Sequence, residues 1–115
     1  MNIADLLNQH SSPQTQALGA DAIASGLALL TQWRRDGDSI LRQFDFKNHY
    51  RTMAFVNAVS WISHGEDHHP EMTVGYNRCT VRYNTHSVND GRGGLSINDF
   101  ICAAKVDALF NSAPN

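Results

Sequence analysis

The spacing of apolar residues along the chain predicts two helices in its first half. Residues 20–30 are rich in Ala and Leu, and Asp21 suits the first turn of a short helix that ends near Thr31. Residues 47–64 contain neither Pro nor Gly, which favours a long central helix. Its apolar residues recur at helical spacing, at Phe55, Val59 and Ile62 with Ala54, Ala58 and Trp61 beside them.

Between these helices the pattern is typical of a β-hairpin. Residues 30–35 and 39–46 flank Asp36-Gly37, a dipeptide that supplies positive φ in tight turns. In the second arm one face carries the apolar side chains, with Arg42 as the polar exception: Ile40, Phe44 and Phe46. We therefore expect a hairpin with one apolar side.

The second half of the chain predicts another pair of strands and a last helix. Residues 71–74 and 76–86 are expected to be strands, and His86 belongs to the polar side of its strand because Cys79, Val81 and Tyr83 alternate with polar residues. After a Gly-rich loop, Ser96 and Asp99 have the spacing of a capping box that opens a helix. The predicted buried edge of this helix comprises Ile97, Ile101, Ala104 and Ala108.

The order helix, hairpin, helix, hairpin, helix favours the α+β class. We expect a single-domain two-layer sandwich, in which a four-stranded antiparallel sheet has helices packed on one face. The domain is expected to span residues 20–111. Residues 1–19 are polar and lack a sustained apolar period, so they are expected to form a partly disordered tail.

Composition excludes several classes of function. The chain has 115 residues with 42% hydrophobic residues, which fits one compact domain. A net charge of -2 argues against direct nucleic-acid binding, and no apolar stretch approaches the roughly 20 residues of a membrane span. Cys79 and Cys102 lack a CxxC spacing and are expected to be reduced, buried thiols in a cytoplasmic protein without a signal peptide.

The candidate chemistry lies in a cluster of histidines. Four of the six histidines fall between His64 and His86, and His68-His69-Pro70 stands at the exit of the central helix. Since His86 comes from the end of a neighbouring strand, three imidazoles could surround one cleft. Imidazole gives or takes a proton near neutral pH, so the cluster suits acid–base catalysis.

Other interpretations of the cluster stay open. The histidines could be solvated or core-edge residues with capping duties. His64 and His68 are four residues apart and His86 could add a third nitrogen ligand for zinc, although the stretch lacks an HExxH pattern. A nucleophilic Cys79 is disfavoured because it lies on the apolar face of its strand.

The same residues resemble the signature of the pterin-4a-carbinolamine dehydratases. That pattern has a charged residue, three residues, His-His-Pro, an aromatic residue, a His and an Asp; here it is met by His64, His68-His69-Pro70, Tyr76, His86 and Asp99. The resemblance covers residues 20–110 and includes Trp33. There are two departures: His64 stands where relatives often carry Glu, and the loop 88–94 is longer than in typical relatives.

The resemblance implies dehydration of a 4a-hydroxytetrahydropterin to quinonoid dihydropterin and water, in tetrahydrobiopterin recycling, with no cofactor and no metal. It implies that His68 exchanges a proton at the 4a-hydroxyl, with His86 beside it and His69 as a binding or second proton-transfer group. It assigns substrate contact to Trp33, His64, Pro70 and Tyr76. Trp33 could instead anchor the sheet, and the capping position favours a structural or auxiliary role for Asp99.

The resemblance also implies partners. Relatives form homodimers or homotetramers and are linked to an aromatic amino acid hydroxylase, and some act as dimerisation cofactors for a homeodomain transcription factor. A non-enzymatic scaffold is therefore the alternative function. The intact histidine cluster favours the enzyme, because a scaffold does not need clustered imidazoles.

Overall fold

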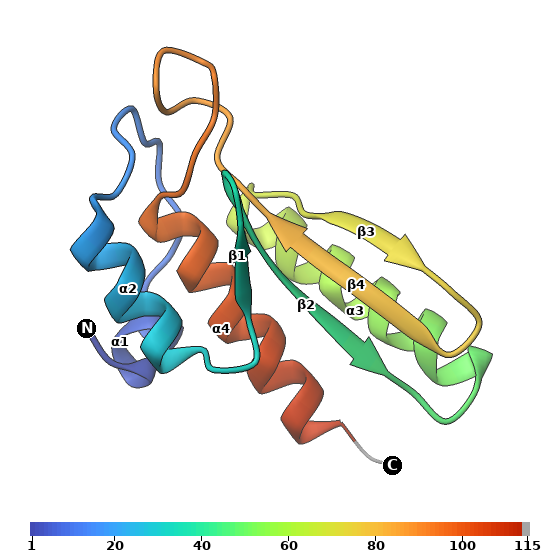
Figure 1. Cartoon of the computed structure of the whole chain (residues 1–115). Coiled ribbons are helices and arrows are strands. Elements are labelled where there is room, and N and C mark those ends of the chain that lie inside the picture. The colour runs from blue at the N-terminus through green and yellow to red at the C-terminus, as the bar shows by residue number, and fades with distance from the viewer. Residues whose placement is uncertain (114–115) are drawn as a thin grey trace.

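The computed structural model describes residues 1–113 and shows a four-stranded antiparallel sheet with helices packed against it (Figure 1). The strands lie in the order β1-β2-β4-β3 and comprise β1 (Arg34–Asp36), β2 (Ser39–Asp45), β3 (Glu71–Val74) and β4 (Arg78–Tyr83). The helices are α1 (Ile3–Asn8), α2 (Ala20–Leu29), α3 (His49–Glu66) and α4 (Ile97–Ser112). From α2 onward this order confirms the predicted α+β architecture.

The two central strands, β2 and β4, carry the core of the sheet. Ile40 pairs with Tyr83 and Phe44 with Cys79, and all four side chains are at most 1% exposed. Figure 1 shows α3 and α4 behind the sheet, on the side that these residues face. The alternation read from the sequence is thus confirmed in β4, whereas in β2 Leu41 is buried as well as Ile40 and Phe44. The tight turn at Gly37, whose φ is 57°, is also confirmed.

Helix α3 has an N-cap at Asn48 and a C-cap at Asp67. The Asn48 side chain accepts a hydrogen bond from the Arg51 N–H at its start. The helix continues through Gly65 and Glu66, beyond the predicted end at residue 64. It stops at Asp67, whose left-handed φ of 49° lets its N–H bond to the His64 carbonyl. The prediction for Trp61 was wrong, because this side chain is 81% exposed and the buried face consists of Thr52, Phe55, Val59, Ser63 and Glu66.

Helix α4 is the most deeply buried helix element. Its capping box at Ser96 and Asp99 is confirmed. The buried surface is wider than the single predicted edge, since α1 and α3 both contact α4 and the ring of Phe100 lies against Gly26 of α2. Ala108 was predicted in that edge but is exposed.

The first 19 residues differ from the expected polar tail. Asn2 caps α1, and Leu6 packs into the core with no exposed surface. The chain then runs past the ends of α3 and α4 and rejoins the fold where the Leu18 N–H bonds to the Leu95 carbonyl. A single buried leucine and long-range backbone hydrogen bonds hold this segment, and neither leaves a periodic signal in the sequence.

Candidate active site

A cavity of about 440 Å³ lies where the ends of α3, β4 and α4 meet the N-terminal segment. His68, His69 and His86 all line it. Residues 67–69 follow the end of α3, and His86 follows the end of β4. The convergence expected from the sequence is therefore present, and the volume lies within the range of about 300–1,000 Å³ usual for small-molecule sites.

His68 is the most firmly positioned of the three imidazoles. Its Nε2 lies 2.6 Å from Oδ1 of Asp99, and its ring stacks on Tyr83 at a centroid distance of 5.6 Å and an interplanar angle of 10°. Burial raises the pKa of the Tyr83 hydroxyl far above its usual range, so this ring stays neutral beside the imidazole. The His68 side chain is 11% exposed, which leaves it open only on its cavity side.

Asp99 fixes which nitrogen of His68 is available for chemistry. The carboxylate is fully buried and also accepts hydrogen bonds from the Thr85 hydroxyl and the Ser96 N–H, each at 2.9 Å. A carboxylate only accepts, so His68 must donate from Nε2. Nδ1 is then the nitrogen of His68 that is left for a contact with a ligand, as in other imidazoles held by a buried carboxylate. The predicted capping role of Asp99 is thus confirmed, and the structure adds an orienting contact with His68.

His69 and His86 are more exposed than His68. His86 continues the polar side of β4, as the alternation predicted. Side chains of this kind can move toward a bound ligand, whereas His68 is held by ring stacking and a hydrogen bond. The site therefore combines one imidazole held by ring stacking and a hydrogen bond with two exposed ones.

The N-terminal segment forms a wall of this cavity that the sequence did not predict. We call residues 10–14 the strap; Ser11, Ser12, Pro13 and Gln14 line the cavity. Glu66 accepts hydrogen bonds from the Ser11 N–H at 2.8 Å and from His10 at 3.0 Å. Asn98 accepts from the Ser12 N–H at 3.1 Å and donates to the Ser12 carbonyl at 2.7 Å.

Glu66 is a buried carboxylate with an unusually complete set of donors. Lys105 completes the set at 2.9 Å. Burial alone raises the pKa of the Glu66 carboxyl, but the hydrogen bonds from Lys105, the Ser11 N–H and His10 together lower it to about 2. Glu66 therefore stays ionised and bound to the strap throughout the neutral pH range.

Four residues expected at the substrate do not line the cavity: Trp33, His64, Pro70 and Tyr76. Trp33 is 4% exposed, packs between Phe44 and Tyr83, and donates from Nε1 to Asp107 at 2.8 Å. Its alternative interpretation, an anchor for the sheet, fits this environment. Trp33 directly precedes the short strand β1, and its buried indole adds a large apolar surface to the core.

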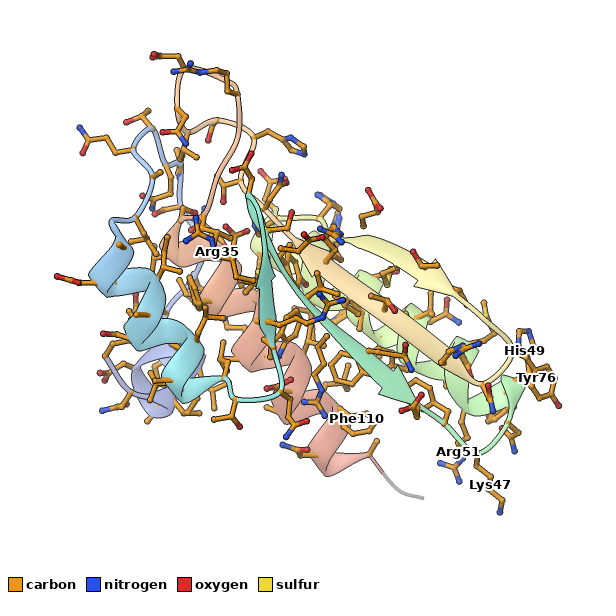
Figure 2. The ribbon with its side chains drawn as sticks, in the orientation of Figure 1. Arg35, Lys47, His49, Arg51, Tyr76 and Phe110 are labelled. Carbon is orange, nitrogen blue, oxygen red and sulfur yellow. The ribbon has the colours of Figure 1, made fainter. Side chains whose placement is uncertain are left out.

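Tyr76, His64 and Pro70 lie outside the cavity, each at a different place in the fold. Figure 2 shows Tyr76 beside His49 at the β3–β4 turn, where the two rings stack at 5.4 Å. This turn lies at the opposite end of β4 from His86. His64 lies on an exposed position of α3, and Pro70 directs the chain from the histidine pair into β3.

Neither a metal centre nor a second, larger cavity offers the same set of groups as this site. Among residues 1–113, no three His, Cys, Asp or Glu side chains are grouped to hold one metal ion. A cavity of about 760 Å³ lies between α3 and the end of α4, near Lys47, Arg51 and Phe110 (Figure 2). Its lining is mostly apolar and includes no histidine, so it lacks the imidazole cluster of the first cavity.

Comparison with protein families gives one match over most of the chain. The model described as pterin 4 alpha carbinolamine dehydratase matches residues 16–109. Two similar proteins, from Bdellovibrio bacteriovorus and Nitrosospira multiformis, are provisionally named pterin-4-alpha-carbinolamine dehydratases. The first is 55% identical over 95% of this chain and 91% of its own length, and the second 52% identical over 94% and 95%.

Two solved structures are also similar. One is described as a transcriptional coactivator/pterin dehydratase from Brucella melitensis; it has a TM-score of 0.74 and 28% identity and covers 82% of this chain and 98% of its own. The other is a pterin dehydratase-like protein identified as a RuBisCO assembly factor in the alpha-carboxysome. It has a TM-score of 0.59 and 25% identity and covers 71% of this chain and 93% of its own.

Among the described residues, no helix has both the length and the apolar character to cross a membrane.

Proposed function

The chain belongs to the pterin 4 alpha carbinolamine dehydratase family, and from this premise we propose that it dehydrates a 4a-hydroxytetrahydropterin by histidine acid–base catalysis. The observation that carries the proposal is the convergence of His68, His69 and His86 on one cavity. We include in the proposal the link to an aromatic amino acid hydroxylase, whose reaction would supply the carbinolamine for tetrahydrobiopterin recycling.

The reaction needs only proton transfers. The C4a–O bond breaks as the 4a-hydroxyl takes up a proton and leaves as water, and the N5–H proton is removed as its electron pair forms the C4a=N5 bond. The product is quinonoid dihydropterin, and no electron leaves or enters the protein. One protein acid near the oxygen on C4a and one protein base near the hydrogen on N5 are sufficient.

The geometry supports His68 as the acid at the 4a-hydroxyl. With Nε2 bound to Asp99, protonated His68 presents Nδ1–H, and the buried carboxylate stabilises the positive charge of the ring. His86 or His69 then accepts the N5 proton, since both line the same cavity. Exposure of these two rings to water lets them release that proton after each turnover.

We expect His68→Ala and His86→Ala to reduce the enzyme-catalysed dehydration rate by about 10²- to 10⁴-fold, the usual contribution of a positioned acid or base. The measurement is a hydroxylase-coupled assay of 4a-hydroxytetrahydropterin breakdown. His64→Ala is the matched control, because this imidazole lies outside the cavity, and its rate should equal that of the wild type. A wild-type protein that does not accelerate the breakdown would refute the proposal.

The alternative, a scaffold that acts on another protein, draws on the described roles of the two solved relatives. The same assay separates the alternatives, because a scaffold would leave the spontaneous rate unchanged. Circular dichroism and sedimentation of each variant check that the fold and the subunit number, which we propose to be two or four, are preserved.

A further inference from the structure

The strap is a part of the cavity wall that lies outside the residues matched by the family model. That model begins at residue 16, whereas Ser11, Ser12, Pro13 and Gln14 line the cavity together with the three histidines. The strap therefore adds a boundary to a cavity whose histidines all lie within the matched residues.

The strap is held in place by side chains that are themselves buried. Glu66 is 9% exposed and Asn98 is 6% exposed, and both direct their polar atoms at the strap backbone. Ser87 adds a hydrogen bond from its hydroxyl to the Gln14 carbonyl. Burying a carboxylate and an amide has a free-energy cost unless they are hydrogen-bonded, so these contacts mark a fixed wall and not a chance placement of a tail.

The strap presents hydrogen-bonding groups of a particular kind. Gln14 donates from Nε2 to the Ser12 hydroxyl oxygen at 3.1 Å. This contact orients both side chains. It leaves the side-chain oxygen Oε1 of Gln14 as an acceptor and the Ser12 O–H as a donor. The pair matches a hydroxyl group, which both donates and accepts.

We propose that the strap recognises the substituent on C6 of the pterin and favours a hydroxylated one. The inference rests on the proposed function, which places C4a and N5 of the substrate at the histidines. C6 is bonded to N5, so its substituent lies next to the reacting atoms and within the same cavity. Ser12 and Gln14 line this cavity together with the three histidines, and they offer a hydroxyl and an amide to that substituent.

The test compares two substrates in the hydroxylase-coupled assay. One is the 4a-hydroxy form of tetrahydrobiopterin, which has a dihydroxypropyl group at C6, and the other is that of 6-methyltetrahydropterin, which has no hydroxyl there. Gln14→Ala should lower the ratio of kcat/KM for the first substrate over the second by about two- to tenfold, the effect of one lost hydrogen bond. Gln16→Ala is the matched control, since Gln16 is exposed and does not line the cavity, and the ratio should not change.

A second variant tests the strap as a whole. Asn98→Ala removes both hydrogen bonds to Ser12 and should lower the same ratio. It should also speed alkylation of Cys102, whose sulfur lies 3.6 Å from the Ser11 hydroxyl, while Cys79 in the sheet stays protected. Faster alkylation of Cys102 alone thus shows that the strap has loosened in a folded protein.

The outcomes separate this inference from the proposed function. Wild-type turnover of both substrates with an unchanged ratio in Gln14→Ala and Asn98→Ala would overturn the role of the strap and leave the dehydratase activity standing. A wild type that accelerates neither substrate would overturn the proposed function and, with it, this inference. A ratio that falls in both variants and not in Gln16→Ala would support it.

Discussion

At the scale of single residues, the pairing of Asp99 with His68 links the fold to the chemistry. One carboxylate caps α4 through the Ser96 N–H and orients the imidazole through its other oxygen. Because the same group performs both tasks, the position of the His68 ring is tied to the start of a buried helix. The expectation of a capping role was correct, and the sequence held no signal for the contact with His68, which joins residues 31 positions apart.

Asp99→Asn tests this positioning role. An amide that turns its N–H₂ toward Nε2 reverses the tautomer of neutral His68 and removes the charge that stabilises the imidazolium form. We expect kcat to fall about 10- to 100-fold, with a changed pH profile of kcat.

Asp107→Asn is the control for that variant, because Asp107 also lies on α4 and accepts hydrogen bonds from Trp33 and Arg42 but does not line the cavity. It should lower thermal stability and leave the pH profile of kcat as in the wild type. Equal pH profiles for Asp99→Asn and the wild type would contradict the positioning role.

At the scale of elements, the helices show what local sequence determines. The capping box of α4, the Asp36-Gly37 turn and the alternation in β4 were predictable, because each depends on residues within a few positions. The strap was not, since its anchors Glu66 and Asn98 lie 55 and 86 residues from the groups they bind. The environments of Trp33 and Tyr76 were equally hidden, because the sequence does not show that neither side chain reaches the histidine cavity in the folded chain.

Two glycines in helices give opposite predictions for the same substitution. A Cβ on Gly26 would lie 2.5 Å from the buried ring of Phe100, whereas a Cβ on Gly65 meets no atom within 4 Å. Gly26→Ala should therefore lower the free energy of unfolding by about 1–2 kcal/mol through overpacking. Gly65→Ala should raise it by about 0.5–1 kcal/mol through reduced backbone entropy of the unfolded chain.

Urea denaturation followed by circular dichroism measures both values. Gly19→Ala serves as the reference, because this position precedes α2 and its Cβ would also meet no atom. Stabilisation by Gly26→Ala would show that α2 and α4 pack less closely than described.

At the scale of the whole molecule, Glu66 joins three parts of the chain. It ends α3, binds Lys105 of α4 and holds the strap. Its pKa of about 2 lies below the usual value of 4.5, so the folded state binds its proton less readily than the unfolded state. The resulting stability is complete above pH 4.5 and is lost as the pH falls toward 2.

Glu66→Gln should therefore lower the free energy of unfolding at pH 7 by about 1–3 kcal/mol and flatten its decrease between pH 4.5 and 2. Urea titrations at several pH values provide the measurement. Glu71→Gln is the control, since Glu71 is exposed on β3 and should behave as the wild type. If the free energy of unfolding of Glu66→Gln still fell steeply between pH 4.5 and 2, other carboxylates would be responsible for the acid sensitivity.

The strap is attached mainly through its main chain, although the His10 side chain also bonds to Glu66. Glu66 accepts a hydrogen bond from the Ser11 N–H, and Asn98 bonds to both the N–H and the carbonyl of Ser12. Ser87 donates to the backbone carbonyl of Gln14. Such groups are common to nearly all amino acids, so replacement of the side chains at 11, 12 and 14 leaves the anchorage intact. Descendants of this gene can thus accumulate mutations along the segment while the three imidazoles of the cavity are inherited unchanged.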